Sequence, residues 1–163
     1  MKRLIYILAL LVIHETGFSQ NKLQDGIYLI DPSASNHAVV IKDNRAIVQI
    51  NPSFFEGDPE TYKPLVVLTD DFIPFKLADV PVIQHSNGNE GQVLVHLTDS
   101  TVQQLKVFTE KNIMKQVVVI VDNQAIAIYK ISQPVSSGFI EIARCTGSAC
   151  GQVLRELKTS SKI

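Results

Sequence analysis

The sequence feature that most constrains the fold is the apolar, β-branched segment Gln116–Val121 (QVVVIV). A continuous run of this kind beside a turn signal is typical of a central strand that is buried on both faces. Asp122 and Asn123 follow it directly, and both residue types favour tight turns. The chain therefore turns there into a second strand, which we expect at residues 125–130.

A helix is expected before this central strand. Ser100 and Gln103 are spaced as in a capping box, where the two side chains satisfy free amide groups at a helix start. Leu105 and Phe108 then recur at helical spacing, so that one face of the helix is apolar to about Asn112.

The neighbouring segments complete a regular pattern. Residues 92–97 alternate between apolar and polar, residues 139–143 resemble a further strand, and residues 148–158 are expected to form a closing helix. The order is strand, helix, strand, strand, strand, helix, which is typical of a sheet with two helices packed on one side.

The preceding part of the chain is less regular. Asp43 and Asn44 lie between two strand-like runs, at residues 38–42 and 46–50, as a two-residue hairpin turn requires. Prolines recur from Pro52 onward and discourage a long helix. The predicted fold class is therefore α+β: a mainly antiparallel sheet with two helices packed on one face, preceded by a β-hairpin and proline-rich loops.

The first residues have the three-part organisation of a secretory signal peptide. Lys2 and Arg3 precede an apolar run at residues 4–13, and small residues follow before a cleavage site expected near Ser19/Gln20. The alternative is a retained anchor, but this run is much shorter than the roughly 20 residues that a membrane-spanning helix needs. We therefore expect a periplasmic or secreted protein with no stable membrane span after signal cleavage.

The predicted organisation is a signal peptide (1–19), a β-hairpin and loop-rich N-terminal part (20–89), an α+β subdomain (90–158) and a flexible tail (159–163). Removal of the signal leaves 13 basic and 15 acidic residues, a net charge of −2. No cluster of Lys and Arg remains, and nucleic-acid binding normally requires one. We therefore expect no nucleic-acid partner.

Cys145 and Cys150 are the one pair of residues whose chemistry depends on the expected compartment. Two thiols this close in sequence can form a disulfide in an oxidising space. Inert free thiols and a redox function remain open as alternatives, because a helix start near Cys150 could lower its pKa. The spacing differs from the C-x-x-C of thioredoxin-like sites, and two cysteines cannot fill a zinc site.

No other residues form a catalytic, cofactor-binding or metal-binding motif. His96 alternates with apolar neighbours and is expected on a sheet face, and neither His37 nor His85 falls in an H-E-x-x-H frame. The pair Asp70 and Asp71 lacks the loop motif that would support acid-base or calcium chemistry. We interpret these aspartates as solvated loop charges, and we expect no cofactor.

Residues 90–158 resemble the head subdomain of the first periplasmic domain of SecD/SecDF protein-export membrane proteins. The resemblance lies in the ordered segments VLVHLTDSTVQQLKVFTEKN, QVVVIVDNQAIAIYKI, and PVSSGFIEIARCTG followed by CGQVLREL. The chain departs from the family where Asn123 replaces the usual Gly of the central turn. The resemblance implies the fold, an extracytoplasmic compartment and contact with extended or unfolded polypeptides or with an envelope protein.

Two functional hypotheses follow. In the first, the protein is a non-enzymatic binding or accessory module that takes up an extended peptide by strand addition, in protein export or another envelope process. In the second, it is a small extracytoplasmic enzyme or redox protein that uses Cys145/Cys150. We favour the first, because no nucleophile lies beside a base in the sequence.

Overall fold

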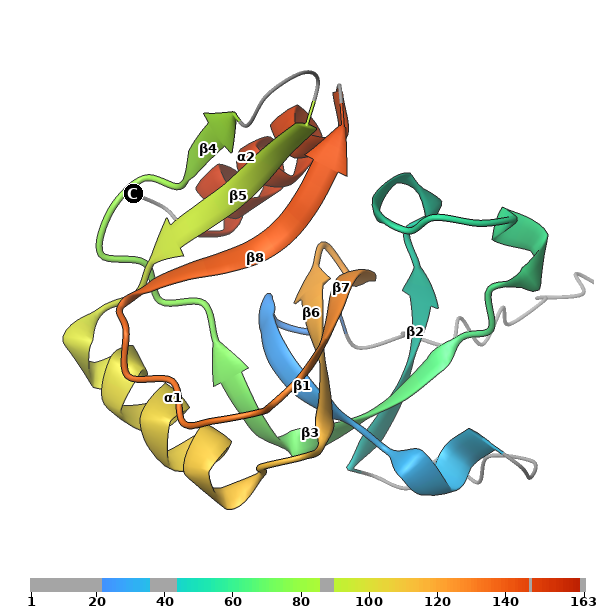
Figure 1. The fold of residues 1–163 in the computed structure, drawn as a ribbon, viewed down its shortest axis with the longest axis horizontal. Coiled ribbons are helices and arrows are strands. Elements are labelled where there is room, and N and C mark those ends of the chain that lie inside the picture. Colours follow the sequence, from blue (N-terminus) through green and yellow to red (C-terminus); the bar gives the residue numbers. More distant parts are fainter. Residues whose placement is uncertain (1–21, 36–43, 86–89, 147, 162–163) are drawn as a thin grey trace, which may run out of the picture.

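The computed structural model describes residues 22–35, 44–85, 90–146 and 148–161. The predicted signal peptide, the strand-like run at residues 38–42 and Asp43 of the predicted hairpin turn lie outside the described residues. Each described part of the chain belongs to one of two sheets, to a helix that packs on them, or to a connecting segment (Figure 1).

The strands within these ranges are β1 (Gly26–Ile30), β2 (Arg45–Ile50), β3 (Leu65–Pro74), β4 (Val82–His85), β5 (Glu90–His96), β6 (Gln116–Val121), β7 (Gln124–Lys130) and β8 (Phe139–Thr146). The α-helices are α1 (Asp99–Lys111) and α2 (Ser148–Ser161). Three short 3₁₀ turns, each beginning at a proline, are η1 (Pro32–Ser35), η2 (Pro52–Phe54) and η3 (Pro59–Thr61).

The first sheet is a closed barrel with the strand order β1-β3-β2-β7-β6. Its closure depends on a short parallel contact, in which Gln49 and Ile50 at the end of β2 pair with Gln124 and Ala125 at the start of β7. The remaining barrel pairs are antiparallel. Beyond this contact the rest of β7 has no strand partner on its outer side among the described residues.

The strand β6 joins the two apolar cores of the molecule. Val118 and Ile120 point into the barrel, where both are fully buried. The alternate residues Val117, Val119 and Val121 point out of the barrel into a second core. The prediction that Gln116–Val121 is a buried central strand is confirmed, because successive side chains of a strand point to opposite faces and here both faces are covered.

The turn after β6 explains the Asp-Asn pair. Asp122 and Asn123 have φ values of 46° and 65°. Positive φ at both central residues is the conformation of a type I′ hairpin turn, which Asn and Asp tolerate better than most residues. The buried carboxylate of Asp25 also accepts a hydrogen bond of 2.9 Å from the Asp122 backbone N–H, which ties the start of β1 to this turn.

The second sheet has the order β4-β5-β8, and α2 lies behind it in Figure 1. Its inner face carries Val93 and Val95 of β5, which pack with apolar residues of both helices and of the outer barrel wall. Leu105 of α1 and Leu157 of α2 are buried in this core, and each is at most 2% exposed. The second core is therefore the layer between the barrel, the three-stranded sheet and the helices.

The predicted α+β class is confirmed, with two helices packed against mainly antiparallel strands. The structure adds that the strands of residues 90–158 are divided between the sheets. β5 and β8 pair with each other, whereas β6 and β7 complete the barrel with β1, β2 and β3. Sequence patterns could not reveal this division, because apolar periodicity identifies a buried strand but not the strand beside it.

The start of α1 corrects the predicted capping box. The N-cap is Thr98 rather than Ser100, and its side chain makes no capping hydrogen bond. Leu97, immediately before it, is 1% exposed, and its N–H donates to the Gly138 carbonyl oxygen at 2.8 Å. Because Leu97 is held in this way, the helix begins two residues later, at Asp99, and Ser100 lies within its first turn.

Burial of β6 yields a stability prediction. Ile120→Ala removes most of a fully buried side chain from the barrel core. We expect the free energy of unfolding to fall by about 2–5 kcal/mol, because the transfer energy is lost and a cavity is left. Val107→Ala on α1 is the matched control, since Val107 is 63% exposed. Its effect should stay within about 0.5 kcal/mol. Urea unfolding followed by circular dichroism measures both, and equal effects would contradict the assigned core.

Candidate functional site

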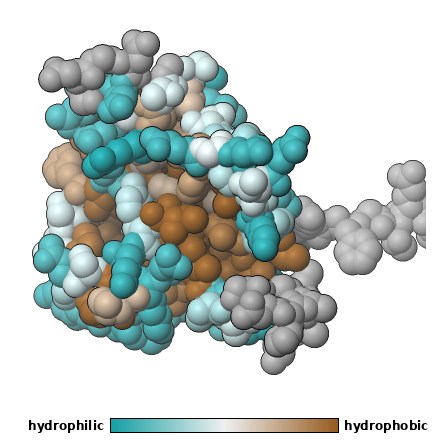
Figure 2. Space-filling model, turned by 45° about the vertical axis from the view of Figure 1, so that its right-hand side comes forward, coloured by the Kyte–Doolittle hydropathy of each residue, from teal (hydrophilic) through white to brown (hydrophobic). Residues whose placement is uncertain are grey.

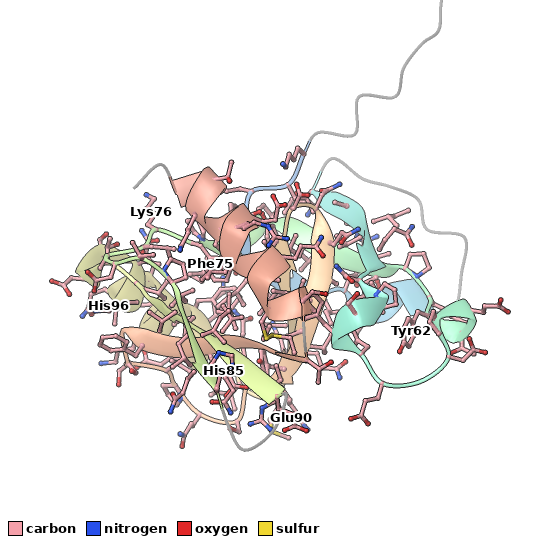
Figure 3. The ribbon with its side chains drawn as sticks, turned by 90° about the horizontal axis from the view of Figure 1, so that it is seen from above. Tyr62, Phe75, Lys76, His85, Glu90 and His96 are labelled. Carbon is pink, nitrogen blue, oxygen red and sulfur yellow. A yellow bond between two sulfur atoms is a disulfide. The ribbon has the colours of Figure 1, made fainter. Side chains whose placement is uncertain are left out.

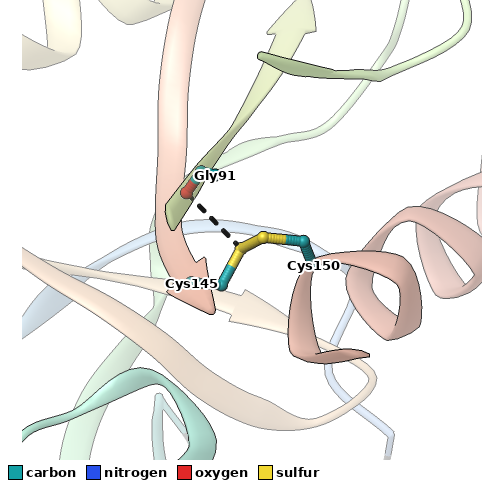
Figure 4. The surroundings of a disulfide bond; sticks show 3 residues. All are labelled: Gly91, Cys145 and Cys150. Carbon is teal, nitrogen blue, oxygen red and sulfur yellow. Dashed lines mark hydrogen bonds between the residues drawn. A yellow bond between two sulfur atoms is a disulfide. The ribbon is translucent and has the colours of Figure 1, made fainter. Parts of the chain in front are cut away.

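The structure joins Cys145 and Cys150 in a disulfide between the end of β8 and the first turn of α2 (Figure 4). Their Cα atoms are 5.4 Å apart, within the normal range for a disulfide. Both cysteines are buried, at 6% and 4% exposure. The Cys145 sulfur lies 3.7 Å from the Gly91 carbonyl oxygen.

The space beside this disulfide at position 91 is too small for any residue larger than glycine. A Cβ atom added there would lie 2.9 Å from the Cys150 sulfur and 3.1 Å from a methyl group of Ile83. The cross-link therefore sits in a tightly packed part of the second core. Its burial suits a structural bond, because thiol-disulfide exchange requires that an attacking thiolate reach the sulfur.

The acidic pair noted in the sequence, Asp70 and Asp71, has structural partners. The Asp71 carboxylate pairs with the Lys111 ammonium of α1 at 3.0 Å, and Asp70 accepts a hydrogen bond of 3.3 Å from the Asn44 side chain. The interpretation of these aspartates as loop charges is wrong in placement, because both lie in β3. The disulfide joins β8 to α2, so the aspartates and the cysteines lie on different elements. Within the described ranges, no three side chains of metal-ligand type group together.

His96 lies on the outward face of the three-stranded sheet, as its alternation in the sequence predicts. Its ring stacks on the exposed ring of Phe139 with centroids 4.0 Å apart, and its Nδ1 lies 2.5 Å from an Asp79 carboxylate oxygen. His85 is exposed in β4, and Figure 3 shows His96 and Glu90 at opposite ends of β5. His37 lies outside the described residues.

The aromatic segments anchor their surroundings in different ways. Phe72 and Phe75 lie in or just after β3, where Phe72 stacks on Tyr28 at 4.5 Å and Phe75 is 9% exposed. Phe54 packs against the second core from η2, and Phe55 makes an edge contact of 6.1 Å with Tyr62. These phenylalanines therefore pack against neighbouring parts of the fold.

Two hollows beside β8 are the candidate functional site. The first, which we call the apolar hollow, is a cavity of about 320 Å³. Its lining residues are Ile27, Leu105, Phe108, Thr109, Val117, Val119, Tyr129, Lys130, Ile131, Ser132, Gln133, Val135, Ile140, Glu141 and Ile142. Figure 2 shows apolar side chains gathered in the middle of one face of the molecule, with polar side chains around them.

The wall of the apolar hollow is held by hydrogen bonds of backbone groups and of the Thr109 hydroxyl. The Val135 N–H donates to the Thr109 hydroxyl of α1 at 2.9 Å, and that hydroxyl donates in turn to the Leu105 carbonyl. The Met114 N–H donates to the Ile131 carbonyl oxygen at 2.7 Å. The connection between β7 and β8 is therefore fixed to α1, and the hollow is a built feature of the fold.

The second hollow, which we call the polar hollow, has a volume of about 350 Å³ and lies by the other half of β8. It is lined by Ser53, Phe54, Phe55, Glu56, Glu90, Gly91, Gln92, Arg144, Cys145 and Thr146. The loop around η2 thus forms one side, and the adjoining ends of β5 and β8 form the other.

The edge of β8 runs past both hollows. β8 pairs with β5 on one side and is the last strand of its sheet. On its other side, residues 140–146 have no strand partner among the described residues. The register shift opposite Val93 and Leu94 leaves Ile142 as an extra residue in β8. Such a bulge bends a strand, and bulges are common at sheet edges.

Two charged side chains connect the hollows. The Arg144 guanidinium donates to a Glu141 carboxylate oxygen at 2.8 Å, and this interaction raises the pKa of Arg144. Burial, with a further contribution from Glu141, raises the pKa of Tyr129 to about 12. The Tyr129 hydroxyl beside the apolar hollow is therefore neutral at physiological pH.

Sequence reasoning identified the cysteines but missed both hollows. Their walls come from segments far apart in the chain, so no local motif or spacing marks them. The available signal was indirect: Ile140 and Ile142 alternate with Glu141 in a strand that ends near a predicted helix. Alternation predicts which residues share a face but not whether a neighbouring strand covers the edge.

No protein-family model and no curated protein matches the sequence. Among solved structures, the fold matches SecDF in its super-membrane-facing form at 17% identity, with a TM-score of 0.52. This match covers 83% of the present chain and 18% of that chain. A second structure, of a membrane component SecDF that enhances protein export, has 13% identity and a TM-score of 0.46. It covers 85% of the present chain and 63% of that one.

The chain shares its fold with part of SecDF. The predicted resemblance to the SecD/SecDF periplasmic fold is therefore confirmed, and the match with SecDF extends beyond residues 90–158. The chain spans less than a fifth of the length of the first SecDF chain. In the described part of the present chain, no helix combines the length and apolar character that a bilayer crossing requires.

The disulfide yields a second prediction. Replacing both cysteines by serine should lower the free energy of unfolding by about 2 kcal/mol, because the unfolded chain regains the entropy of a small loop. Urea unfolding of the oxidised protein and of the double variant measures the difference. Thiol counting under native and denaturing conditions is the control. Two reactive thiols in the denatured, unreduced protein would show that the bond is not formed.

Proposed function

We propose that the protein is an exported, non-enzymatic module that binds extended segments of polypeptide during protein export or a related envelope process. The observation that carries this proposal is the unpaired edge of β8 between the apolar hollow and the polar hollow. An edge strand offers backbone N–H and C=O groups to an incoming chain, and adjacent pockets receive its alternate side chains. Both elements of strand addition are present along β8.

The structure of the edge supports a binding role. An unprotected strand edge invites aggregation, and proteins commonly shield such edges with charges, bulges or covering loops. β8 carries the charged pair Glu141 and Arg144 and the bulge at Ile142, which limit uncontrolled pairing. The η2 loop and part of β7 lie near this edge, but no strand of the described residues pairs with it beside the apolar cavity. Such an arrangement is expected for controlled, reversible contact with a chain.

The likeness to SecDF supports the process in which this binding takes place. The sequence resemblance concerns a periplasmic part of protein-export membrane proteins, and the fold agrees with it. The predicted signal peptide and the Cys145–Cys150 disulfide both fit an oxidising compartment outside the cytoplasm. The module would therefore meet exported chains before they fold, when extended segments with apolar side chains are accessible.

A redox role for Cys145/Cys150 is the second candidate, and the geometry favours it less. Both cysteines are buried, and within the described residues no hydrogen bond or ion pair links either of them to a histidine or a lysine. A catalytic disulfide needs an accessible sulfur and a stabilised thiolate. We therefore assign the disulfide a structural role, as the link that holds α2 to the end of the edge strand.

Binding of a permanently unfolded polypeptide tests the proposal. We expect the signal-free protein to bind a fluorescently labelled, reduced and alkylated polypeptide in an anisotropy titration. Tyr129→Asp places a charge at the apolar hollow and should weaken binding about tenfold or more, the loss typical of a central contact.

Val82→Asp provides the matched control, since Val82 is 55% exposed and lies on β4 at the opposite edge of the same sheet. Its binding should equal that of the unaltered protein, and circular dichroism should show both variants folded. Absence of binding by the unaltered protein, or equal weakening in the two variants, would contradict the proposed function.

A further inference from the structure

Resting on this proposed function, the geometry points to one class of segment: an extended peptide with a large apolar side chain and a Lys or Arg about four residues apart. The apolar residue would occupy the apolar hollow, and the basic residue would lie in the polar hollow. The backbone between them would run along the edge of β8.

The first half of this inference follows from the floor of the apolar hollow. Leu105 and Phe108 of α1 and Val117 and Val119 of β6 line it, and each of these four is at most 5% exposed. Its volume of about 320 Å³ is at the lower end of the range for ligand pockets, roughly 300–1,000 Å³. The space therefore suits one large side chain better than a folded partner.

The second half follows from the charges around the polar hollow. Glu56 and Glu90 line it, and no basic side chain of the described residues lies within 4 Å of either. Arg144 also lines it but is engaged by Glu141 at 2.8 Å. Glu141 thus neutralises Arg144, and the carboxylates of Glu56 and Glu90 leave a local charge of about −2. A cationic side chain complements this charge.

The spacing follows from the strand between the hollows. Ile140 lines the apolar hollow and Cys145 lines the polar hollow. Because Ile142 is an extra residue in β8, these two residues lie opposite Val95 and Gly91, which are four residues apart on β5. At a rise of about 3.3 Å per residue, four residues of an extended chain span about 13 Å. Side chains at i and i+4 of an extended chain also point to the same face. A docked strand can therefore fill both hollows together.

Four labelled peptides of equal length on a Ser/Thr background test this inference with the signal-free protein. They carry Phe and Lys, Phe and Glu, Ser and Lys, or Ser and Ser at positions i and i+4, and the first three are also made in the reversed order. Anisotropy titration at low salt gives each Kd. The Phe/Lys peptide in one order should bind best, and Phe/Glu should bind about threefold to tenfold more weakly, as expected for exposed charges.

Removing the carboxylates isolates the charge effect. The double variant Glu56→Gln with Glu90→Gln should bind the Phe/Lys and Phe/Glu peptides with nearly equal Kd values, and high salt should do the same to the unaltered protein. Glu110→Gln is the matched control, because Glu110 lies on α1 and faces Lys106. That variant should keep the full preference for Phe/Lys.

The outcomes separate the two proposals. If Phe/Lys and Phe/Glu bind equally, or if Phe/Glu binds more tightly, the inferred class of segment is wrong while the binding function stands. If Ser/Lys binds as tightly as Phe/Lys, the apolar half of the inference is wrong. If none of the peptides binds and the unfolded polypeptide does not bind either, the proposed function itself fails.

Discussion

The burial of β6 on both faces is the interaction on which the rest of the structure depends. Val118 and Ile120 complete the barrel interior, while Val117, Val119 and Val121 form the surface on which α1, α2 and the second sheet pack. A strand with only one apolar face would leave one of these cores incomplete. The same two-sided burial makes β6 part of the floor of the apolar hollow, so the core and the candidate site share residues.

The edge strand β8 is positioned by constraints at its two ends. Phe139 at its start exchanges hydrogen bonds with the Ser137 hydroxyl, and Cys145 near its end is joined to α2. Between them the bulge at Ile142 changes the direction of the strand. A strand held at both ends can leave its outer edge unpaired without fraying, because pairing with β5 and the cross-link supply its order. Both ends of the proposed binding edge are thus held in place before any ligand arrives, which reduces the entropy lost on binding.

Local chemistry in the sequence was sufficient for several elements of the fold. The apolar run Gln116–Val121, the turn at Asp122 and Asn123 and the closing helix at Ser148 all have the predicted character. The start of α1 was misplaced by two residues, because the buried Leu97 determines where the chain can enter the helix. Local propensity describes what a segment prefers, whereas an anchored neighbour determines where that preference begins.

The sequence by itself determined the α+β class, the central strand, the order of elements 90–158 and the proximity of Cys145 to Cys150, because these depend on neighbours along the chain. Only the tertiary structure decided that β6 and β7 close a barrel with β1, β2 and β3 while β5 and β8 form another sheet. It also placed Leu105, Val117 and Ile140 around one hollow and Glu56, Glu90 and Arg144 around another. The physical reason is that strand pairing and cavity walls depend on contacts between distant segments, which periodicity does not encode.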